Sequence, residues 1–332
     1  MPLVDPGGRA IDYLRLSITD DCNLRCLYCR PNGAAPERDA GGILGFDEAL
    51  RICAVLCGLG IRAIRITGGE PLLRKGVAGF VRRLKALPGI ARLSVTTNGA
   101  LLGASLRALA DAGLDSLNVS LDTLDEEKFA RLTGGRPGTV AEVLRALDEA
   151  LALGLSVKIN CVPLRGFNEE ELADIALLAR DRKIAARFIE LMPLGAASAM
   201  LPVPTDETMA IIEAAFGRLQ PTSERPGLGP AEYRALPGFV GLVGFIGAIS
   251  RGFCEGCNRL RLTSRGILRA CLSSEVSADL GALSRAGADD GEIAGAALDL
   301  VARKPAGHSM GGAGAKLEKA NHDGTRMFSI GG

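Results

Sequence analysis

The chain has 332 residues, of which 47% are hydrophobic and 4% aromatic. Its 39 Lys and Arg nearly balance its 38 Asp and Glu, which excludes an overall charge that attracts nucleic acid or an anionic membrane. The length suits one large α/β domain with an appendage, or two domains. The start of the chain has no basic and apolar leader, and the most apolar run, residues 239–249, is too short to span a bilayer. We therefore expect a cytoplasmic protein that binds neither nucleic acid nor membrane.

Strand-like and helix-like segments alternate along the first two-thirds of the chain. Strands are expected at residues 14–19, 61–67, 91–97, 114–121, 155–162 and 185–192. Helices are expected at residues 46–60, 75–87 and 104–113, and from Glu126, Val140 and Asn168 onward. This alternation predicts a parallel sheet covered by helices, either open or curled into a partial barrel. After Phe216 the sequence turns Pro- and Gly-rich and then β-like, so we divide the chain into domains at residues 1–216 and 217–332.

Polar side chains gather where the predicted strands end. The clusters are TGGEP at residues 67–71, TTNG at residues 96–99, SLD at residues 120–122 and ELMP at residues 190–193. In parallel α/β folds the site forms at the carboxyl ends of the strands. The repeated clusters therefore favour a site along that edge of the sheet.

A first group of cysteines, Cys22, Cys26 and Cys29, has the spacing C-x3-C-x2-C. A structural zinc site needs four protein ligands, and residues 30–52 contain neither Cys nor His. Closely spaced cysteines on a loop are typical of iron–sulfur clusters. The group therefore favours a cluster in which one iron has no protein ligand. Three other cysteines lie in apolar stretches and are expected to be small buried hydrophobes; these are Cys53, Cys57 and Cys161.

A second group also contains only three cysteines, Cys254, Cys257 and Cys271. It fits either a second incomplete cluster or a zinc site that a distant ligand completes. Arg259 and Arg261 lie between these cysteines, and on a strand two residues so spaced point to the same face. Beside a metal site they would form an anion pocket suited to phosphate, whereas the alternative is a solvated basic edge strand.

Together these motifs resemble the radical S-adenosylmethionine (SAM) superfamily. The first cysteine group with Tyr28, and the stretches ITGGEPLLR, TTNG, NVSLD and RFIELMPLG, are similar to its landmarks. The stretch FCEGCNRLRLTSRGILRACL and the terminal SIGG narrow the resemblance to the GTP 3′,8-cyclase family, the molybdenum cofactor biosynthesis proteins A. The resemblance covers residues 14–332. It implies an incomplete (βα)6 TIM-like barrel with a C-terminal extension that carries a second Fe–S cluster.

The resemblance also implies a reaction. The family consists of lyases that convert GTP to (8S)-3′,8-cyclo-7,8-dihydroguanosine 5′-triphosphate, the first step of molybdenum cofactor biosynthesis. A 5′-deoxyadenosyl radical from SAM would take the C3′ hydrogen of GTP, and C3′ would then attack C8 of guanine. The cofactors would be SAM and two [4Fe-4S] clusters. Cys22, Cys26 and Cys29 would hold the cluster that binds SAM, and the second cysteine group would hold the cluster that binds guanine.

Further residues are assigned by the same resemblance. Contacts to SAM would come from Tyr28, Gly69, Ser120 and Met192. Contacts to GTP would come from Arg15, Arg65, Thr96, Lys158, Arg259 and Arg261. A direct role in catalysis is implied for Arg15, Gly331 and Gly332, because the terminal Gly-Gly of the family reaches into the active site.

The sequence departs from the family at two positions. Ala63 stands where Lys is common, so one phosphate contact is expected to be missing or to come from another residue. Arg30 follows Cys29 where Met is more usual. His308 and His322 are expected to lie at the surface or to pack against the tail, without a catalytic role.

Other functions compete with this interpretation. The main alternative is a peptide-modifying radical SAM enzyme with an auxiliary cluster, although such enzymes usually carry a longer cysteine series. A non-enzymatic Fe–S electron carrier and a zinc-stabilised scaffold are the others. If the resemblance holds, the partners are GTP, a reductant such as flavodoxin or ferredoxin, and cyclic pyranopterin monophosphate synthase as the recipient of the product. A homodimer is left open.

Overall fold

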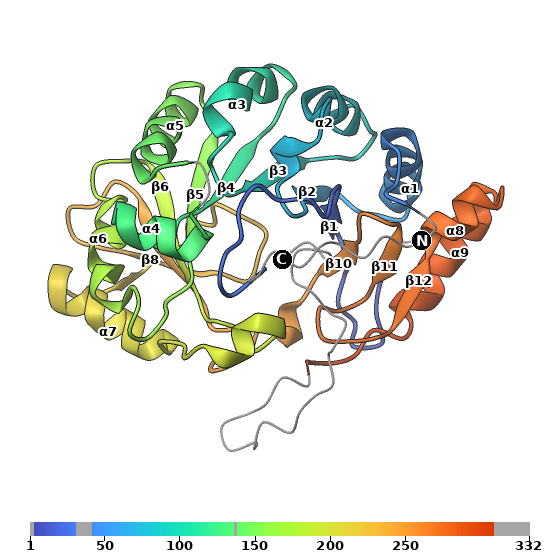
Figure 1. Ribbon diagram of the computed structural model, residues 1–332. Coiled ribbons are helices and arrows are strands. Elements are labelled where there is room, and N and C mark those ends of the chain that lie inside the picture. Colours follow the sequence, from blue (N-terminus) through green and yellow to red (C-terminus); the bar gives the residue numbers. More distant parts are fainter. Residues whose placement is uncertain (1–2, 31–41, 136–137, 309–332) are drawn as a thin grey trace.

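The computed structural model describes residues 3–30, 42–135 and 138–308, and it is organised around one curved sheet (Figure 1). Six strands follow one another in chain order and pair in parallel. They are β1 (Tyr13–Ser17), β2 (Ala63–Thr67), β3 (Arg92–Thr97), β4 (Ser116–Ser120), β5 (Ser156–Cys161) and β6 (Ile184–Ile189). A helical crossover between successive strands returns the chain to the same end of the sheet, which makes the pairing parallel. The predicted strands and their parallel order are confirmed.

Helices cover the outer side of this sheet. They are α1 (Phe46–Gly58), α2 (Val77–Lys85), α3 (Leu102–Asp111), α5 (Val140–Ala152) and α6 (Leu172–Leu177), whereas α4 (Glu126–Thr133) lies in front of the strands in Figure 1. In Figure 1, α1, α2, α3, α5 and α6 form an arc around the strands. The boundaries follow local signals: Thr139 and Glu142 form a capping box at the start of α5, and Gly76, with φ of 85°, precedes α2. The helix expected from Asn168 begins later, at Leu172, because a 3-10 turn comes first.

The segment beyond residue 216 joins the same sheet at both ends. After α7 (Thr205–Phe216), β9 (Leu242–Ile246) pairs in parallel with β6, and β10 (Arg259–Leu262) pairs in parallel with β1. Antiparallel strands continue beyond them: β7 (Gln220–Pro221), β8 (Glu232–Ala235), β11 (Ile267–Arg269) and β12 (Ser277–Asp279). In the described part of the chain, the second cysteine group therefore lies next to β1, the strand that leads into the first cysteine group. The domain boundary at residue 216 stays a prediction.

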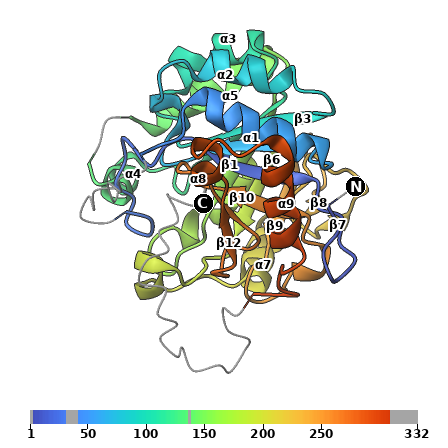
Figure 2. The ribbon, with the colours of Figure 1, turned by 90° about the vertical axis from the view of Figure 1, so that its right-hand side faces the viewer.

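Two more helices lie on the β12 side of the molecule. They are α8 (Leu280–Arg285) and α9 (Asp290–Val301), and both contact α1 (Figure 2). No helix in the described ranges is long and apolar enough to cross a membrane.

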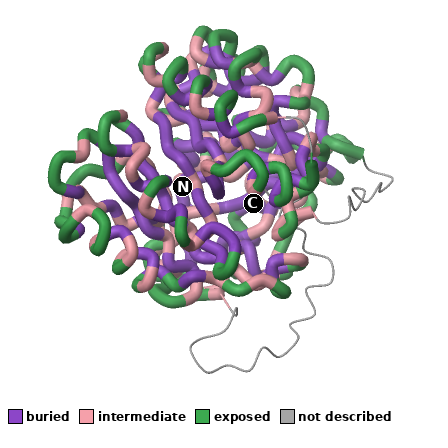
Figure 3. Tube along the Cα trace, turned by 60° about the vertical axis from the view of Figure 1, so that its left-hand side comes forward, coloured by how far each residue is buried: buried purple, intermediate pink, exposed green. Residues whose placement is uncertain are grey.

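The two faces of the sheet differ in chemistry. Outward-facing residues such as Leu14, Leu16, Ile64 and Ile66 are buried in one apolar cluster with the helices. In Figure 3 the strands are mostly buried and the outer helical turns exposed. The intervening residues face inward and are largely polar or charged; examples are Arg15, Arg65, Thr96, Asn160, Arg187 and Arg261. An apolar interior would make the barrel a packed core, whereas this polar interior leaves a chamber for a ligand.

Candidate functional site

Both cysteine groups line one cavity of about 310 Å³ on the inner face of the sheet. The same cavity is lined by all four residues expected to contact SAM and by five of the six expected to contact GTP. The sixth, Lys158, lies in a smaller pocket alongside, and Arg65 lines both. The structure therefore brings together residues that are more than 230 positions apart in the sequence, such as Cys22 and Cys257.

The first cysteine group lies on the loop after β1, and the Gly68–Gly69 turn after β2 packs directly against that loop. The Gly69 N–H donates to Thr19 O at 2.8 Å, and the Glu70 N–H donates to Asp21 O at 2.7 Å. A Cβ on Gly69 would lie 2.2 Å from Asp21 O, far inside contact distance. The backbone at Gly69 therefore lies so close to the cysteine loop that only glycine fits at this position.

Glu70 ties this turn to the end of β3. Its carboxylate accepts from Leu72 N at 3.0 Å, Thr97 Oγ1 at 2.9 Å and Asn98 N at 2.8 Å. Burial raises the pKa of Glu70 to about 7, although these hydrogen bonds oppose the shift. Asn98 in turn donates to Asn23 Oδ1 at 2.9 Å. The polar strand ends therefore support the cysteine loop, a role that the sequence did not assign to Glu70.

Asp122, at the end of β4, holds Tyr28. The Tyr28 hydroxyl donates to Asp122 Oδ2 at 2.6 Å, and Val162 N donates to Oδ1 at 2.7 Å. Burial raises the pKa of Asp122 to about 6. Asp122 lines the cavity beside Ser120. The NVSLD motif contained this residue, but nothing local in the sequence showed that it would meet Tyr28.

Arg30 braces the first cysteine loop from its far end. Its Nη1 donates to Asp20 O at 3.2 Å, which links the residue after Cys29 to one that precedes Cys22. This contact gives a structural reason for an arginine at the position where Met is more usual.

The second cysteine group lies around the β10–β11 hairpin. Cys254 is in a 3-10 turn, Cys257 lies just before β10 and Cys271 follows β11. The buried Lys304 donates through Nζ to Arg259 O at 2.9 Å and also to Ala270 O. It therefore joins the two sides of the hairpin next to the cysteines.

Arg9, near the other end of the chain, also reaches this group. Its Nη1 donates to Cys254 O at 2.6 Å, and its Nη2 donates to Pro305 O at 2.7 Å. The sequence did not predict a role for Arg9 or Lys304, because each acts on backbone carbonyls that are distant in the chain.

Three arginines lie side by side on neighbouring strands. Arg261 of β10 is in register with Arg15 of β1, and Arg15 is in register with Arg65 of β2. Burial, reinforced by Arg261 and Arg65, lowers the pKa of Arg15 well below its usual value. Burial and then Arg259 lower the pKa of Arg261 to about 10. Repulsion among buried like charges is costly without a counter-charge, so the row is suited to an anionic ligand.

Several of these cationic and polar groups have buried atoms without a hydrogen-bond partner in the described residues. The atoms are Arg15 Nε, Arg65 Nε, Thr96 Oγ1 and Lys158 Nζ. They belong to four of the six residues expected to contact GTP. Native proteins satisfy most buried polar groups, so such a group of unsatisfied atoms is typical of a binding site. Arg187 is different, since it donates to Asn118 Oδ1 at 2.7 Å and to Asn160 Oδ1 at 3.0 Å; it lines the cavity and was not predicted.

The donor set suits iron–sulfur clusters. All six cysteines are free thiols at the cavity wall. In the described ranges no set of three or more His, Cys, Asp or Glu side chains could hold a single metal ion. The three thiols of each group match the ligand type and number of a four-iron cluster with one open iron.

Comparison with known proteins gives the relationship. A family model described as "Radical SAM superfamily" matches residues 16–179, and one described as "Molybdenum Cofactor Synthesis C" matches residues 184–310. A GTP 3′,8-cyclase of Pelotomaculum thermopropionicum is 44% identical, over 92% of this chain and 95% of the relative. A GTP 3′,8-cyclase of Peptoclostridium acidaminophilum is 42% identical, over 99% of this chain and 98% of the relative. A GTP 3′,8-cyclase of Moorella thermoacetica is 45% identical, over 92% of this chain and 95% of the relative. The chain belongs to the GTP 3′,8-cyclase family of radical SAM enzymes.

The family membership confirms the predicted fold class. It also confirms the predicted cofactors, which are SAM and [4Fe-4S] clusters. The crystal structure of Streptococcus suis SuiB, 18% identical, matches with a TM-score of 0.51 over 62% of this chain and 46% of that one, which shows a shared fold alone.

Two expectations concern the C-terminal end. His308 was expected at the surface or against the tail, but it lines the cavity with Nε2 2.8 Å from Ala248 O. His308 is partly exposed, so its place at the cavity wall is compatible with that expectation, and its packing against the tail stays a prediction. Gly331, Gly332 and His322 lie outside the described residues.

Proposed function

We propose that the chain binds GTP in this cavity and converts it to (8S)-3′,8-cyclo-7,8-dihydroguanosine 5′-triphosphate, the first step of molybdenum cofactor biosynthesis. The observation that carries the proposal is the row of Arg261, Arg15 and Arg65, in register on three strands, in a cavity that both cysteine groups line. A row of guanidiniums matches a polyphosphate. It fits a nucleotide better than the peptide of the alternative radical SAM reading.

Each cysteine group would hold one cluster. Cys22, Cys26 and Cys29 would leave an open iron for SAM, and Cys254, Cys257 and Cys271 would leave one for guanine. When bound, SAM and the first cluster would supply the radical chemistry that removes the C3′ hydrogen of GTP and lets C3′ bond to C8, and the external reductant would supply the electron that, with a proton, completes the product.

The protein's own residues bind and orient. Arg15, Arg65 and Arg261 bind the phosphates, and Thr96 donates its hydroxyl. Tyr28 is held by its hydrogen bond to Asp122. Together with Gly69, Ser120 and Met192 it lines the part of the cavity that binds SAM. Because the cavity lies inside the sheet, these residues also exclude water from the reacting atoms.

The partners follow from the reaction. A flavodoxin or ferredoxin would supply electrons, and cyclic pyranopterin monophosphate synthase would receive the product. The terminal Gly331 and Gly332 would enter the cavity.

An anaerobic assay tests the proposed reaction. The full chain is reconstituted with iron and sulfide, and dithionite, SAM and GTP are added. We expect about eight irons per chain if each triad holds a four-iron cluster, and 5′-deoxyadenosine that forms only when GTP is present. If 5′-deoxyadenosine formed with peptides and never with GTP, the proposal would be wrong.

The GTP contacts are tested separately by binding. Arg259→Ala and Arg261→Ala should weaken GTP binding while SAM binding stays unchanged. Equal loss of GTP and SAM binding would instead point to a misfolded variant and contradict the assignment.

A further inference from the structure

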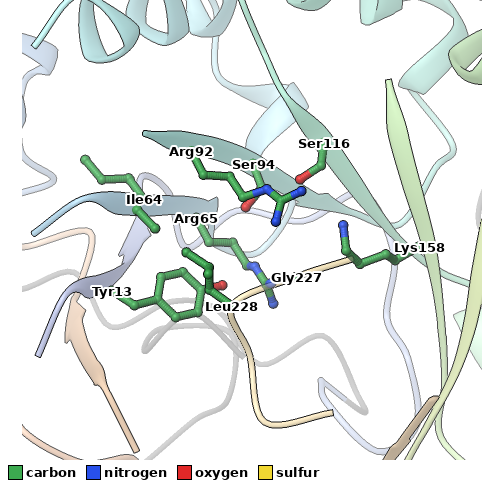
Figure 4. A pocket seen from close by; sticks show the side chains of 10 residues that line it. Tyr13, Ile64, Arg65, Arg92, Ser94, Ser116, Lys158, Gly227 and Leu228 are labelled. Carbon is green, nitrogen blue, oxygen red and sulfur yellow. The ribbon is translucent and has the colours of Figure 1, made fainter. Parts of the chain in front are cut away.

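The buried cations of the molecule differ in what their charged atoms meet. In Figure 4, Arg65 and Lys158 point toward the space of the small pocket beside the cavity, and both have atoms without a hydrogen-bond partner in the described ranges. Lys304 is also buried, at 5% exposed, but its Nζ donates to Arg259 O at 2.9 Å and to Ala270 O. The ammonium of Lys304 is therefore used by the protein itself.

The two carbonyls that Lys304 joins flank the second cysteine group. Arg259 lies two residues after Cys257, and Ala270 comes directly before Cys271. β10 and β11 pair in antiparallel fashion between these points, so the distance between the two thiols depends on how the open end of the hairpin is held. The ammonium of Lys304 bridges the hairpin at that end, beside both cysteines.

The chain that follows Lys304 stays against the same cysteine group. Arg9 Nη1 donates to Cys254 O at 2.6 Å and to Ala306 O at 2.8 Å. A Cβ on Gly307 would lie 3.9 Å from Cys254 Sγ, an ordinary contact distance. The backbone that carries Lys304 is therefore anchored on both sides of the group, which fixes where the ammonium lies.

The charge of Lys304 is not compensated by a carboxylate. Arg9 pairs with Asp5 at 2.5 Å, whereas Lys304 forms no ion pair within residues 3–30, 42–135 and 138–308. Burial lowers the pKa of Lys304, and the charges of Cys257 and Cys271 oppose that shift. Ordinary bond lengths place an ammonium that is bonded to the carbonyl before Cys271 within about 10 Å of its thiol.

A nearby charge acts on an iron–sulfur cluster through its oxidation state. A cluster held by three thiolates is anionic, and it becomes more so when it takes up an electron. A buried cation beside it therefore stabilises the reduced form more than the oxidised form. Net charge and hydrogen bonding around the sulfurs are among the factors that set the reduction potential of such clusters.

We propose that Lys304 is a positioning residue of the second cluster: its hydrogen bonds hold Cys257 and Cys271 at the separation that a shared cluster needs, and its buried charge stabilises the reduced cluster. The inference rests on the proposed function, in which the second cysteine group holds a cluster. It adds a residue that binds neither iron nor GTP and acts through the hairpin and through its charge.

Two variants of the full chain, reconstituted with iron and sulfide, separate the hydrogen bonds from the charge. Glutamine and methionine side chains have the same length, but only glutamine donates hydrogen bonds. Lys304→Gln should keep about eight irons per chain, and Lys304→Met should keep about four, because the second cluster is lost.

An anaerobic redox titration monitored by EPR measures the charge effect, and the first cluster is identified by the change of its signal when SAM is added. At a fixed potential, the ratio of reduced to oxidised second cluster should be about tenfold lower in Lys304→Gln than in the unaltered chain. This is the effect of a unit charge about 10 Å away in a medium of effective dielectric constant about 20, and it lowers the midpoint by about 59 mV for one electron.

Arg303→Gln is the matched control. It removes the same charge one residue earlier in the chain, but Arg303 is exposed and donates through Nε to Asp299 O at 3.2 Å. Because water and salt screen an exposed charge, iron content and both midpoints should stay as in the unaltered chain.

Several results would overturn the inference. An unchanged second midpoint in Lys304→Gln, or an equal shift of both clusters, would refute the charge effect, and about eight irons in Lys304→Met would refute the bridging role. Should Lys304→Gln lose its second cluster, Lys304→Arg, which keeps the charge, replaces it: a tenfold change in its ratio of reduced to oxidised second cluster would equally refute the charge effect.

The proposed function fails by a different result. An unaltered chain that holds two clusters and shows the Lys304→Gln shift, but neither binds nor cyclises GTP, would refute the proposed reaction and leave the role of Lys304 intact. A chain that cyclises GTP, but whose second cluster is insensitive to Lys304→Gln, would do the reverse.

Discussion

Replacing Lys158 with methionine should stabilise the ligand-free protein while weakening GTP binding. Lys158 is 1% exposed, and its Nζ has no hydrogen-bond partner among the described residues. Burial lowers its pKa from 10.5 to about 6. Because the unfolded chain binds this proton more tightly than the folded one, the stability of the unaltered protein falls as the pH drops from about 10.5 to about 6.

The size of the effect follows from that window. Between pH 7 and the ordinary pKa of 10.5 lie 3.5 pH units, which at about 1.4 kcal/mol per unit is an upper limit of about 5 kcal/mol. Relaxation around the charge reduces this limit, and we expect Lys158→Met to add about 2–4 kcal/mol of stability at pH 7. Methionine is one atom shorter than lysine and carries no charge, so the gain should disappear above about pH 10.5.

Anaerobic urea denaturation of the reconstituted protein at pH 7 and pH 10 measures this difference. Lys304→Met is the matched control: Lys304 is also buried, but its Nζ donates to the carbonyls of Arg259 and Ala270. Its loss should therefore destabilise the protein by about 1–3 kcal/mol. If Lys158→Met were less stable than the unaltered protein at pH 7, Lys158 would be a structural residue and the reasoning would be refuted.

Calorimetry in buffers of different ionisation enthalpy gives a second readout. A bound phosphate should raise the pKa of Lys158 again, so GTP binding near pH 7.5 should take up close to one proton. In Lys158→Met this uptake should be absent and GTP affinity lower.

Three further predictions concern the cysteine loops and the tail. Gly69→Ala places a Cβ 2.2 Å from Asp21 O and should displace the first cysteine loop; iron analysis should fall from about eight to about four per chain, and full iron loading would contradict the role of this turn. Tyr28→Phe leaves Asp122 Oδ2 without its hydrogen-bond donor and should cost about 1–3 kcal/mol in urea denaturation, with weaker SAM binding; unchanged stability and SAM affinity would count against the pair. Deletion of Gly331 and Gly332, outside the described residues, should abolish product with iron content intact, and product at the normal rate would exclude a role for the tail.

Much of the site was predictable because its signals are local. The spacings of the two cysteine groups lie within short stretches, and all six thiols line the predicted cavity. The alternation of apolar and polar residues on each strand determines which side chains face the helices and which face inward. The pattern placed Arg15 and Arg65 on the correct strands, but alone it favoured exposed charges there, and only the family resemblance implied that they contact GTP.

Residues that act across the chain could not be found in this way. Asp122 holds Tyr28, and Arg9 holds Cys254, over separations of 94 and 245 positions. Lys304 joins two carbonyls of a hairpin from the end of α9. None of these residues has a neighbouring motif that indicates its partner, because the contact depends on which strands become adjacent.

The sequence by itself determined the helical and strand periods and the two incomplete cysteine groups, because these depend on residue types at short spacings. The radical SAM chemistry was implied by the resemblance of its motifs to a known family. The tertiary structure decided that β10 pairs with β1 and β9 with β6, which brings both cysteine groups to one cavity. It also decided that Arg261, Arg15 and Arg65 lie in one register row. Register between strands is set by the packing of the whole sheet, so neither arrangement can be read from short stretches of the sequence.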